Sequence, residues 1–270
     1  MTTDRTMLIT GATSGLGREL ARQYSLQPGH LIVHGRDPDK LTELIDDLSP
    51  ARARIDAVTA DLADLAQVER LAQEVAGLTG QVSVLVNNAG VGQGRDDVRE
   101  TSADGHELRL AVNHLAPFLL TMRLLPLLEA GAPSRVVNVA SAAQTPFDFN
   151  DPQLTEGYTG SRAYAHSKFA MVTAGFRLAQ RLSADKVTVN SLHPATLMPT
   201  AMVEEGWGAN VDKLATGVSS TRHLIDSPRL HGVTGQYFFR KSPEEALPQA
   251  YDRDVQDRLW RLSEELTGLA

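Results

Sequence analysis

The sequence predicts an α/β protein built on a doubly wound parallel sheet. Short runs of apolar residues alternate with longer helical patterns, and Gly, Asn, Asp or Ser bounds the short runs. Such runs are typical of strands that are buried on both faces, and their alternation with helices is typical of right-handed βαβ units. The chain contains no internal repeat and no Gly/Ser-rich linker. We therefore expect one domain over residues 1–270.

The predicted elements follow one another in strand–helix order. Each expected strand is short and largely apolar: 7–10, 31–34, 55–60, 82–87, 135–140, 187–192 and a last strand at 236–239. The expected helices lie near 15–26, 38–48, 64–77, 103–130, 158–183 and 244–267. Because proline lacks a backbone donor, Pro117 should kink the helix over 103–130, and Pro126 is a candidate for its end. Between 193 and 220 the pattern loosens.

The composition is that of an ordinary globular protein. Of the 270 residues, 42% are hydrophobic and 22% are charged, and the formal net charge is −7. Without cysteine, the chain has no disulfide, thiolate nucleophile or Cys-ligated metal site. The eight histidines form no metal-ligand motif, so we expect no metal. The acidic balance does not favour nucleic acid or a membrane as partner, and no signal-peptide pattern opens the chain, so we expect a cytoplasmic protein.

A glycine-rich turn follows the first expected strand and opens the first helix. Gly11, Gly15 and Gly17 allow a tight turn, close approach of a pyrophosphate and close packing of helix on strand. The helix N-terminus directs free N–H groups and a partial positive charge at the phosphates. The turn predicts a dinucleotide site, with a turn that binds nothing as the simpler alternative. The candidate contacts are Gly11, Thr13, Ser14, Gly15, Leu16 and Gly17.

Two further motifs follow strands on the same side of the expected sheet. Asp61-Leu62 follows the third strand, and Asn87-Asn88-Ala89-Gly90 ends the fourth. With the Gly-x3-Gly-x-Gly turn, they make the chain resemble the short-chain dehydrogenase/reductase family from about residue 7 to 200. From the residues alone, Asp61 could equally cap a helix, and the second motif could be only a turn. The resemblance implies a Rossmann-type fold, adenine contacts at Asp61 and Leu62, and a place beside the cofactor for Asn88, Ala89 and Gly90.

The second strand ends in Gly35-Arg36-Asp37, which bears on the choice of cofactor. An acidic residue at the end of this strand would accept the ribose hydroxyls and repel a 2′-phosphate. Arg36 can instead clamp a phosphate with two hydrogen bonds, and Ser14 could add a hydroxyl donor. Asp37 could cap the next helix, and Arg36 could be a solvated loop charge. The pattern favours NADP(H), with NAD(H) as the alternative.

Tyr164 and Lys168 lie four residues apart, on one face of an expected helix. A free tyrosine has a pKa of about 10, and a nearby lysine cation, together with the positive charge of an oxidised nicotinamide, stabilises the phenolate and lowers that pKa. Ser141 ends the fifth strand, where its hydroxyl could hold a substrate oxygen or merely cap a turn. The resemblance gives Asn113 a water-holding role in a proton relay through Lys168, although it could be a polar residue of a kinked helix. With Asn113, the family's Asn–Ser–Tyr–Lys set is complete.

The segments around Asn113 and Tyr164, and the tail that begins at Leu259, look most like the retinol-dehydrogenase-like branch of the family. The chain departs from the family at Pro194-Ala195, where the family has Pro-Gly, which adds a methyl group near the nicotinamide. The resemblance places Tyr164, Lys168, Pro194 and a threonine beside the cofactor. That threonine is Thr196 or Thr200.

Two long segments, about 142–157 and 194–220, leave the carboxyl side of the expected sheet and should flank the nicotinamide. They carry apolar residues, including Phe147 and Trp207, amid polar ones. This pattern predicts a lid for a bulky, apolar ketone or alcohol, and we expect Trp207 to contact the larger substrates. Alternatively, these side chains anchor the segments to the core or to a neighbouring subunit. The resemblance implies a homodimer or homotetramer.

We expect an NADP(H)-dependent oxidoreductase that interconverts a carbonyl, in a ketone or aldehyde, and an alcohol by hydride transfer, with Tyr164 as general acid/base. One alternative is a sugar-nucleotide-type epimerase or dehydratase on the same scaffold. Another is a non-enzymatic NADP-binding regulator. A hydrolase built on Ser141 and His193 would need a Gly-x-Ser-x-Gly elbow, which is absent. His166 lies off the face that Tyr164 and Lys168 share, and we interpret it as a packing or interface residue.

Overall fold

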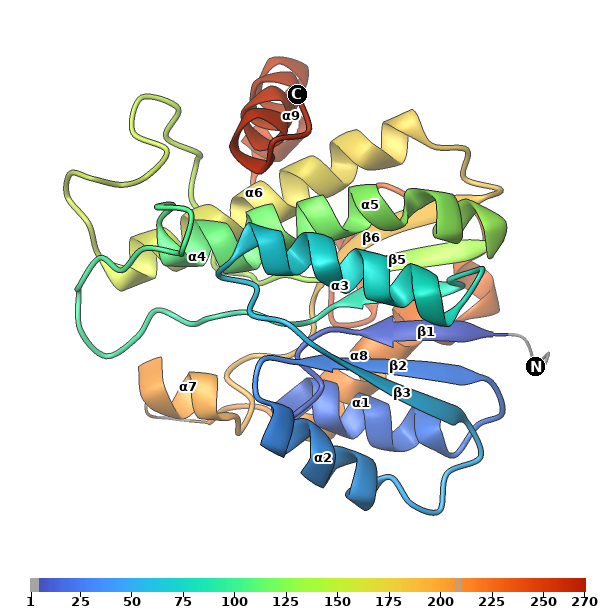
Figure 1. Cartoon of the computed structure of the whole chain (residues 1–270). Helices are drawn as coiled ribbons and strands as arrows, with labels where there is room; N and C mark the ends of the chain where they lie inside the picture. The colour runs from blue at the N-terminus through green and yellow to red at the C-terminus, as the bar shows by residue number, and fades with distance from the viewer. Residues whose placement is uncertain (1–4, 207, 209) are drawn as a thin grey trace.

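A twisted sheet of eight strands forms the centre of the computed structural model, which describes residues 5–206, 208 and 210–270 (Figure 1). The strand order is β3-β2-β1-β4-β5-β6-β7-β8. The first seven strands are parallel, and β8 runs antiparallel to β7. The strands are β1 (Thr6–Ile9), β2 (His30–Gly35), β3 (Arg54–Thr59), β4 (Val84–Asn87), β5 (Ser134–Val139), β6 (Val187–His193), β7 (Tyr237–Phe239) and β8 (Ser242–Glu244). The predicted parallel α/β sheet is confirmed.

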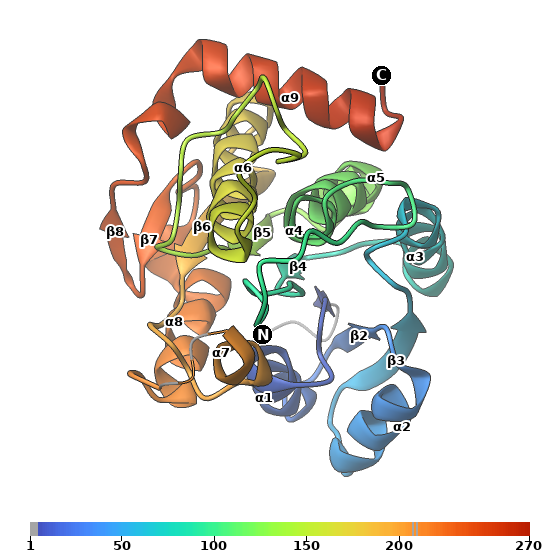
Figure 2. The ribbon, with the colours of Figure 1, turned by 90° about the vertical axis from the view of Figure 1, so that its left-hand side faces the viewer.

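Helices cover both faces of the sheet (Figure 2). The helices α3, α5 and α6 cover one face, whereas α1, α2 and α8 cover the other, and α9 lies across α6. The helices are α1 (Gly15–Ser25), α2 (Pro38–Asp47), α3 (Leu65–Leu78), α4 (Leu108–Leu110), α5 (Ala116–Ala130), α6 (Gly160–Arg181), α7 (Ala201–Gly206), α8 (Leu214–Asp226) and α9 (Arg253–Thr267).

The strands feed two cores, one on each side of the sheet. Side chains of a strand point alternately to opposite faces. In β1, Leu8 packs into the core under α3, α5 and α6, whereas Met7 and Ile9 pack into the core under α1, α2 and α8. In β4, Leu85 packs into the core under α3, α5 and α6, whereas Val86 packs into the core under α1, α2 and α8. Burial on both faces explains why these strands are continuous apolar runs in the sequence.

The helix expected over 103–130 differs from the prediction at both prolines. It begins at Leu108 and contains a π-helical turn, η1 (Ala111–Leu115), just before Pro117. Pro117 lies in the first turn of α5, where a missing N–H costs little, and α5 continues past Pro126 to Ala130. Among the described residues, Leu108–Ala130 is long and apolar enough to cross a membrane, but 72% of its apolar window is buried inside the protein. It is therefore a core helix.

The C-terminal third differs more from the prediction. The segment expected as a loop over 194–220 contains α7 and the beginning of α8. The region expected as one helix over 244–267 begins at the end of β8 and contains a 3₁₀ turn (Pro248–Tyr251) before α9. The Asp252 carboxylate accepts hydrogen bonds from the backbone N–H groups of Asp254 and Val255, and so fixes the beginning of α9.

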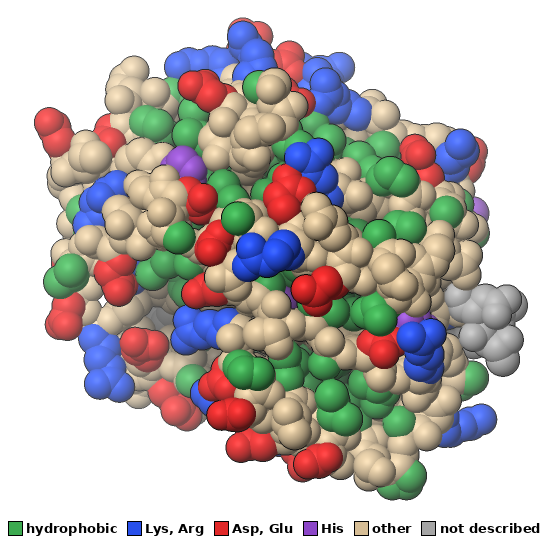
Figure 3. Space-filling view, in the orientation of Figure 1, with side chains coloured by type: hydrophobic (Ala, Val, Ile, Leu, Met, Phe, Trp, Pro, Cys, Tyr) green, Lys and Arg blue, Asp and Glu red, His purple; other side chains and the backbone are tan. Residues whose placement is uncertain are grey.

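The carboxyl ends of the parallel strands lie along one edge of the sheet, which faces the viewer in Figure 2 together with α7 and the long loops. On the face in Figure 3, basic and acidic side chains are interspersed. Arg123 of α5 forms an ion pair with Glu69 of α3 at 2.6 Å. In open α/β sheets, ligands bind along the carboxyl edge.

Candidate active site

The glycine turn between β1 and α1 has the shape that a pyrophosphate needs. Gly11 and Gly15 have φ angles of +64° and +50°, which favour glycine. A Cβ at Gly17 would overlap the carbonyl oxygen of Gly11 and lie 2.6 Å from the Asn88 side-chain nitrogen. The exposed Ser14 is the N-cap of α1, but its side chain makes no capping hydrogen bond. The first-turn N–H groups of α1 therefore remain available for an anion, and the turn fits a dinucleotide.

The Asn-Asn-Ala-Gly motif holds this turn from the end of β4. The Thr10 hydroxyl accepts hydrogen bonds from the backbone N–H groups of Asn88 and Ala89, each at 3.0 Å. The Asn88 amide group donates to the carbonyl oxygens of Thr10 and Gly11, at 2.8 and 3.1 Å. Both Asn88 amide hydrogens are thus engaged by the turn. The Asn88 side chain therefore fixes the backbone of the glycine turn, where the cofactor is predicted to bind.

His34 also holds the glycine turn, and the sequence analysis missed it. Its Nδ1 accepts a hydrogen bond from the N–H of Gly11 at 3.3 Å, and its Nε2 lies 3.0 Å from the carbonyl oxygen of Ala60. These partners require a neutral ring that carries its hydrogen on Nε2. Burial lowers the pKa of His34 to about 4. The signal in the sequence was a histidine at the end of a buried strand, two residues before Arg36.

The structure places the predicted adenosine contacts at the ends of β2 and β3. Arg36 is exposed directly after Gly35, where a Cβ would lie 2.6 Å from a Thr13 methyl group. The Asp37 carboxylate caps α2 by accepting from the N–H groups of Asp39 and Lys40, so the capping alternative is confirmed. Asp61 does not cap α3, because Asp64 does so.

The side chain of Asp61 instead accepts a hydrogen bond from the N–H of Ala63 at 2.9 Å, which closes a tight turn. The neighbouring Leu62 is buried in the core. An adenine contact at either residue stays a prediction.

Three of the four predicted catalytic residues meet between β5 and α6. Ser141 follows β5 and hydrogen-bonds the Tyr164 phenol of α6. The Lys168 Nζ donates to the carbonyl oxygen of Val139 at 2.9 Å and lies 5.7 Å from the centroid of the Tyr164 ring. A Cβ at Gly90 would lie 3.6 Å from Lys168 Nζ, so this group stands next to the Asn-Asn-Ala-Gly motif.

Burial controls the electrostatics of this pair. It raises the pKa of the Tyr164 phenol, which the hydrogen bond with Ser141 lowers in part. Burial also lowers the pKa of Lys168 to about 8. The lowering of the Tyr164 pKa by Lys168 together with an oxidised nicotinamide stays a prediction. Without a further positive charge, the protein therefore keeps Tyr164 protonated at neutral pH.

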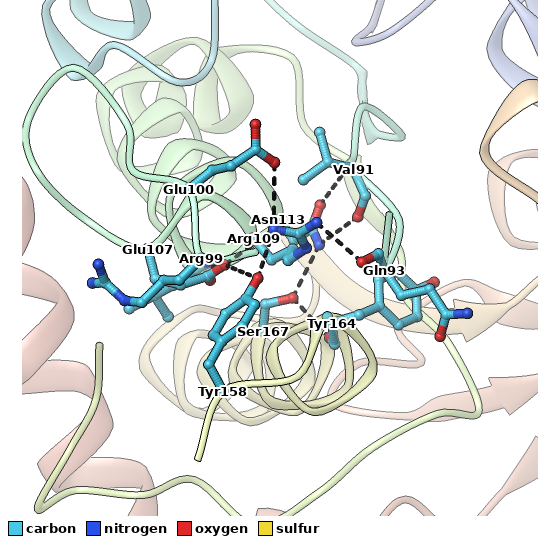
Figure 4. A network of polar contacts seen from close by, with 12 residues as sticks. Val91, Gln93, Arg99, Glu100, Glu107, Arg109, Asn113, Tyr158, Tyr164 and Ser167 are labelled. Carbon is cyan, nitrogen blue, oxygen red and sulfur yellow. Dashed lines mark hydrogen bonds and ion pairs between the residues drawn. The ribbon is translucent and has the colours of Figure 1, made fainter. Parts of the chain in front are cut away.

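The fourth residue, Asn113, lies fully buried in the π-helical turn (Figure 4). Its Oδ1 accepts from the N–H of Val91 at 2.8 Å, and its Nδ2 donates to the carbonyl oxygen of Val91 and to the Ser167 hydroxyl, each at 3.0 Å. The Ser167 hydroxyl donates to the carbonyl oxygen of Tyr164. In an α-helix, the carbonyl of Asn113 would accept from the N–H of residue 117, which is a proline and has none.

Buried histidines hold both of the predicted substrate segments. The His193 Nδ1 accepts from the N–H of Ala142 at 3.1 Å, and its Nε2 lies 3.1 Å from the Thr196 hydroxyl. Ser141, next to Ala142, bonds Tyr164 instead, which does not fit the Ser141–His193 hydrolase alternative. The His166 Nε2 accepts from the N–H of Asp148 at 3.1 Å.

Phe147 anchors the 142–157 segment rather than forming an open wall. Its ring stacks on that of His166, with the centroids 4.0 Å apart, and it is 8% exposed. Leu154 of the same segment is 1% exposed. The anchoring alternative therefore holds for these two side chains, and the interpretation of His166 as a packing residue is confirmed.

A hydrogen bond within the 194–220 segment joins its later part to its beginning. The Asp212 carboxylate accepts from the N–H of Thr196 at 2.7 Å and pairs with Arg240 at 2.8 Å. Thr200 reaches the glycine turn, because a Cβ at Gly15 would lie 3.0 Å from its methyl group. Trp207, the residue expected to contact large substrates, lies outside the described residues.

The two other residues singled out near the start of this segment, Pro194 and Ala195, are buried. A Cβ at Gly217 of α8 would lie 3.7 Å from the Ala195 Cβ. The added methyl group therefore lies close to α8.

Tyr237 of β7 is a further residue that the sequence did not indicate. Its phenol donates to the carbonyl oxygen of Ser141 at 3.0 Å, and it is 3% exposed. It therefore fixes the backbone of Ser141, whose hydroxyl holds Tyr164.

Comparisons with known proteins agree with this geometry. A family model for short chain dehydrogenases matches residues 5–209. Human retinol dehydrogenase 14 is 34% identical over 295 residues, which cover 98% of this chain and 87% of that protein. A crystal structure of an uncharacterized protein from Mycobacterium paratuberculosis has a TM-score of 0.78 at 27% identity and covers 98% of this chain and 93% of that one.

A second solved structure contains a cofactor. It is described as an NAD(P)-dependent gluconate 5-dehydrogenase from Beutenbergia cavernae with bound NADP. It has a TM-score of 0.69 at 28% identity and covers 87% of this chain and 94% of that one. With the family match over most of the chain, these findings show that the chain belongs to the retinol-dehydrogenase-like branch of the short-chain dehydrogenase/reductase family, whose members are NAD(P)(H)-dependent oxidoreductases.

Proposed function

We propose that this chain is an NADP(H)-dependent oxidoreductase that interconverts a ketone or aldehyde and the corresponding alcohol, with Tyr164 as general acid/base. One observation carries the proposal. Tyr164 is buried and bonded to Ser141, and its ring centroid lies 5.7 Å from the buried Lys168 ammonium, which stands beside the Asn-Asn-Ala-Gly motif that holds the glycine turn. A proton donor and a dinucleotide site are therefore adjacent, as hydride transfer to a carbonyl requires.

Each residue of the group has a separate task. When bound, the nicotinamide supplies or accepts the hydride. Tyr164 donates a proton to the carbonyl oxygen during reduction, and its raised pKa keeps that proton available at neutral pH. The Ser141 hydroxyl orients the phenol and the substrate oxygen. Lys168, which the Val139 carbonyl holds in place, would bind the nicotinamide ribose and make the phenolate less costly during oxidation.

The preference for NADP(H) rests on the end of β2. Arg36 is exposed, and its side chain has no ion pair or hydrogen bond within the part of the chain that the structure describes. The nearby Asp37 carboxylate is engaged with the beginning of α2. Arg36 is thus free to clamp a 2′-phosphate, with the exposed Ser14 hydroxyl as a second donor.

The cofactor preference is tested by titrating NADPH and NADH into wild type and Arg36→Asp. The variant should weaken NADPH binding by at least about 2 kcal/mol, the size of a charge-assisted pair, and NADH binding less. Arg52→Asp is the matched control, since Arg52 is exposed in the loop between α2 and β3, at the opposite edge of the sheet. Tighter binding of NADH than NADPH by wild type would refute the preference.

We also propose a bulky, apolar ketone, aldehyde or alcohol as substrate. The relative named retinol dehydrogenase 14 supports this substrate class. A series of aldehydes and ketones of increasing apolar size, followed through the absorbance of the reduced nicotinamide, tests it. Trp207→Ala should lower kcat/KM selectively for the large substrates, by about 1–3 kcal/mol if the indole contacts them. Phe147→Ala should affect all sizes alike, because this ring is an anchor.

A further inference from the structure

Arg109 of α4 is a charged side chain in the interior, and the proposed chemistry does not use it. Its side chain is 4% exposed. Its guanidinium lies 3.5 Å from the Glu107 carboxylate, which is 1% exposed, and 3.8 Å from that of Glu100, which is 60% exposed. Burying such a pair gives little net stability, because desolvation offsets the attraction. We therefore expect Arg109 to have a role other than stabilising the fold.

The guanidinium fixes the backbone of the segment that follows the Asn-Asn-Ala-Gly motif (Figure 4). The Arg109 Nε donates to the carbonyl oxygen of Gly92, and Nη2 donates to that of Gln93, each at 3.0 Å. Four residues later on the same helix face, Asn113 bonds both backbone groups of Val91. Two side chains thus hold three successive carbonyl groups, at residues 91–93.

The segment 91–93 lies between the beginning of α6 and the end of α7. A Cβ at Gly160, at the beginning of α6 and four residues before Tyr164, would overlap the carbonyl oxygen of Gln93. The Gln93 side-chain nitrogen donates to the carbonyl oxygen of Gly206, at the end of α7. Gln93 therefore lies against the helix that carries Tyr164 and also bonds the segment that flanks the site.

A tyrosine completes the network and joins it to α6. The Tyr158 hydroxyl accepts from Arg109 Nη1 at 2.7 Å and donates to the Glu107 carboxylate at 3.3 Å. Burial and the Glu107 charge raise the pKa of Tyr158 to about 12, so the hydroxyl keeps its proton. The backbone N–H of Glu107 donates to the side chain of Gln153 at 2.7 Å, which ties in the 142–157 segment.

We propose that the segment 91–93 forms a wall of the substrate site and that Arg109 is a positioning residue for the substrate: it sets the place of this wall, and through Gln93 that of α7, without touching the substrate. This inference rests on the proposed function. The guanidinium fork is essential to it, because its separate donors reach Gly92, Gln93 and Tyr158. A lysine ammonium keeps the charge but lacks the planar fork that serves these three acceptors.

The experiment compares Arg109→Lys with Arg135→Lys. Arg135 is half-buried at the amino end of β5, on the opposite edge of the sheet, and also donates to two carbonyl oxygens, those of Leu224 and Ser227. Arg109→Lys should raise KM for the carbonyl substrate at least about tenfold, since small displacements of a positioning wall weaken substrate contacts. The value of kcat and the Kd for NADPH should stay within about threefold, and Arg135→Lys should leave KM unchanged.

Amide hydrogen exchange gives a readout that does not depend on activity. Arg109→Lys should accelerate exchange in the peptides that cover 91–100 and 201–206, but not in those that cover the glycine turn. Tyr158→Phe, which removes only one hydroxyl, should accelerate exchange in the same peptides, but by a smaller factor. It serves as the second variant if Arg109→Lys does not fold.

Three outcomes separate the possibilities. A KM shift with faster exchange at 91–100, absent from Arg135→Lys, supports the positioning role. A lower melting temperature in Arg109→Lys with unchanged KM and unchanged exchange at 91–100 overturns it and leaves a purely structural role. If wild type reduces no carbonyl compound, the proposed function fails, and the exchange data on 91–100 alone decide whether Arg109 holds the wall.

Discussion

The cofactor side and the substrate side of the site are held by similar contacts on different kinds of backbone. At the cofactor side, His34 accepts the N–H of Gly11 in a turn whose shape comes from glycines. At the substrate side, His193 and His166 accept the N–H groups of Ala142 and Asp148. Ala142 and Asp148 belong to a long segment without regular structure.

The two sides differ in whether the backbone would keep its shape if these side chains were replaced. The glycine turn is short, is bonded to β4 through Asn88 and opens directly into α1, so backbone geometry supports it. The substrate segments depend on individual side chains such as Phe147 and Asp212. We infer that the cofactor side tolerates few changes of backbone, whereas the substrate side can be reshaped by single side chains.

The largest effect is expected at Tyr164, where the two sides meet. Tyr164→Phe removes the proton donor and should lower kcat by about 10²–10⁴, the usual contribution of a positioned acid. The Kd for NADPH, measured by fluorescence titration, should change by less than about twofold, because the hydroxyl bonds Ser141, which lies outside the glycine turn. Tyr251→Phe, at a 47% exposed tyrosine, is the control. Near wild-type turnover in Tyr164→Phe would remove Tyr164 from the mechanism.

On the cofactor side, the sharpest test is Gly17→Ala. The new Cβ would overlap the Gly11 carbonyl oxygen and push the turn away from α1. We expect a loss of about 1–3 kcal/mol in unfolding free energy, typical of overpacking, and weaker NADPH binding by at least about tenfold. At saturating NADPH, kcat should change little.

Gly77→Ala in α3 is the matched control, since nothing lies within 4 Å of a Cβ there. It should stabilise the protein by up to about 1 kcal/mol, the difference in helix propensity. Wild-type NADPH affinity in Gly17→Ala would contradict the claim that backbone geometry determines the cofactor side.

The same contrast explains which parts could be predicted from the sequence. The glycine turn and the Tyr164–Lys168 pair obey fixed local spacings, and strand order brings them to one edge. The helix α8 was missed because its sequence, LATGVSSTRHLID, has few apolar residues and a glycine at 217. Tertiary packing overrides that weak propensity: Gly217 leaves room for Met198, whose sulfur a Cβ there would overlap.

The contacts that hold the substrate side leave no local pattern. Arg109 and Gln93 are 16 positions apart, and His193 and Ala142 are 51 apart. A side chain that bonds a distant backbone group has no fixed spacing in the sequence. The π-helical turn at Asn113 was missed for a related reason, because proline at 117 indicates a disturbed helix but not the form of the disturbance.

The smallest expected effect is acid sensitivity, which the buried histidines confer on both sides. Burial lowers the pKa values of His34, His166 and His193 to about 4, against 6.5 for the free side chain. Between pH 6.5 and 4 the unfolded chain therefore binds more protons than the folded protein, and stability falls as the pH falls. Each histidine contributes at most about 1.4 kcal/mol per pH unit to this slope.

Two histidine variants test the cofactor side and the substrate side separately. His34→Asn and His193→Asn each place an amide oxygen where Nδ1 accepts its N–H, and neither side chain takes up a proton in this range. Urea unfolding at pH 6.5, 5.5 and 5.0 should show a smaller slope of unfolding free energy against pH in each variant. Below pH 6, wild type should lose affinity for both NADP⁺ and substrate. His34→Asn should reduce only the acid-linked loss of NADP⁺ affinity, and His193→Asn only that of the substrate KM. If one variant alters both acid responses alike, the two sides are coupled and the contrast drawn here is wrong.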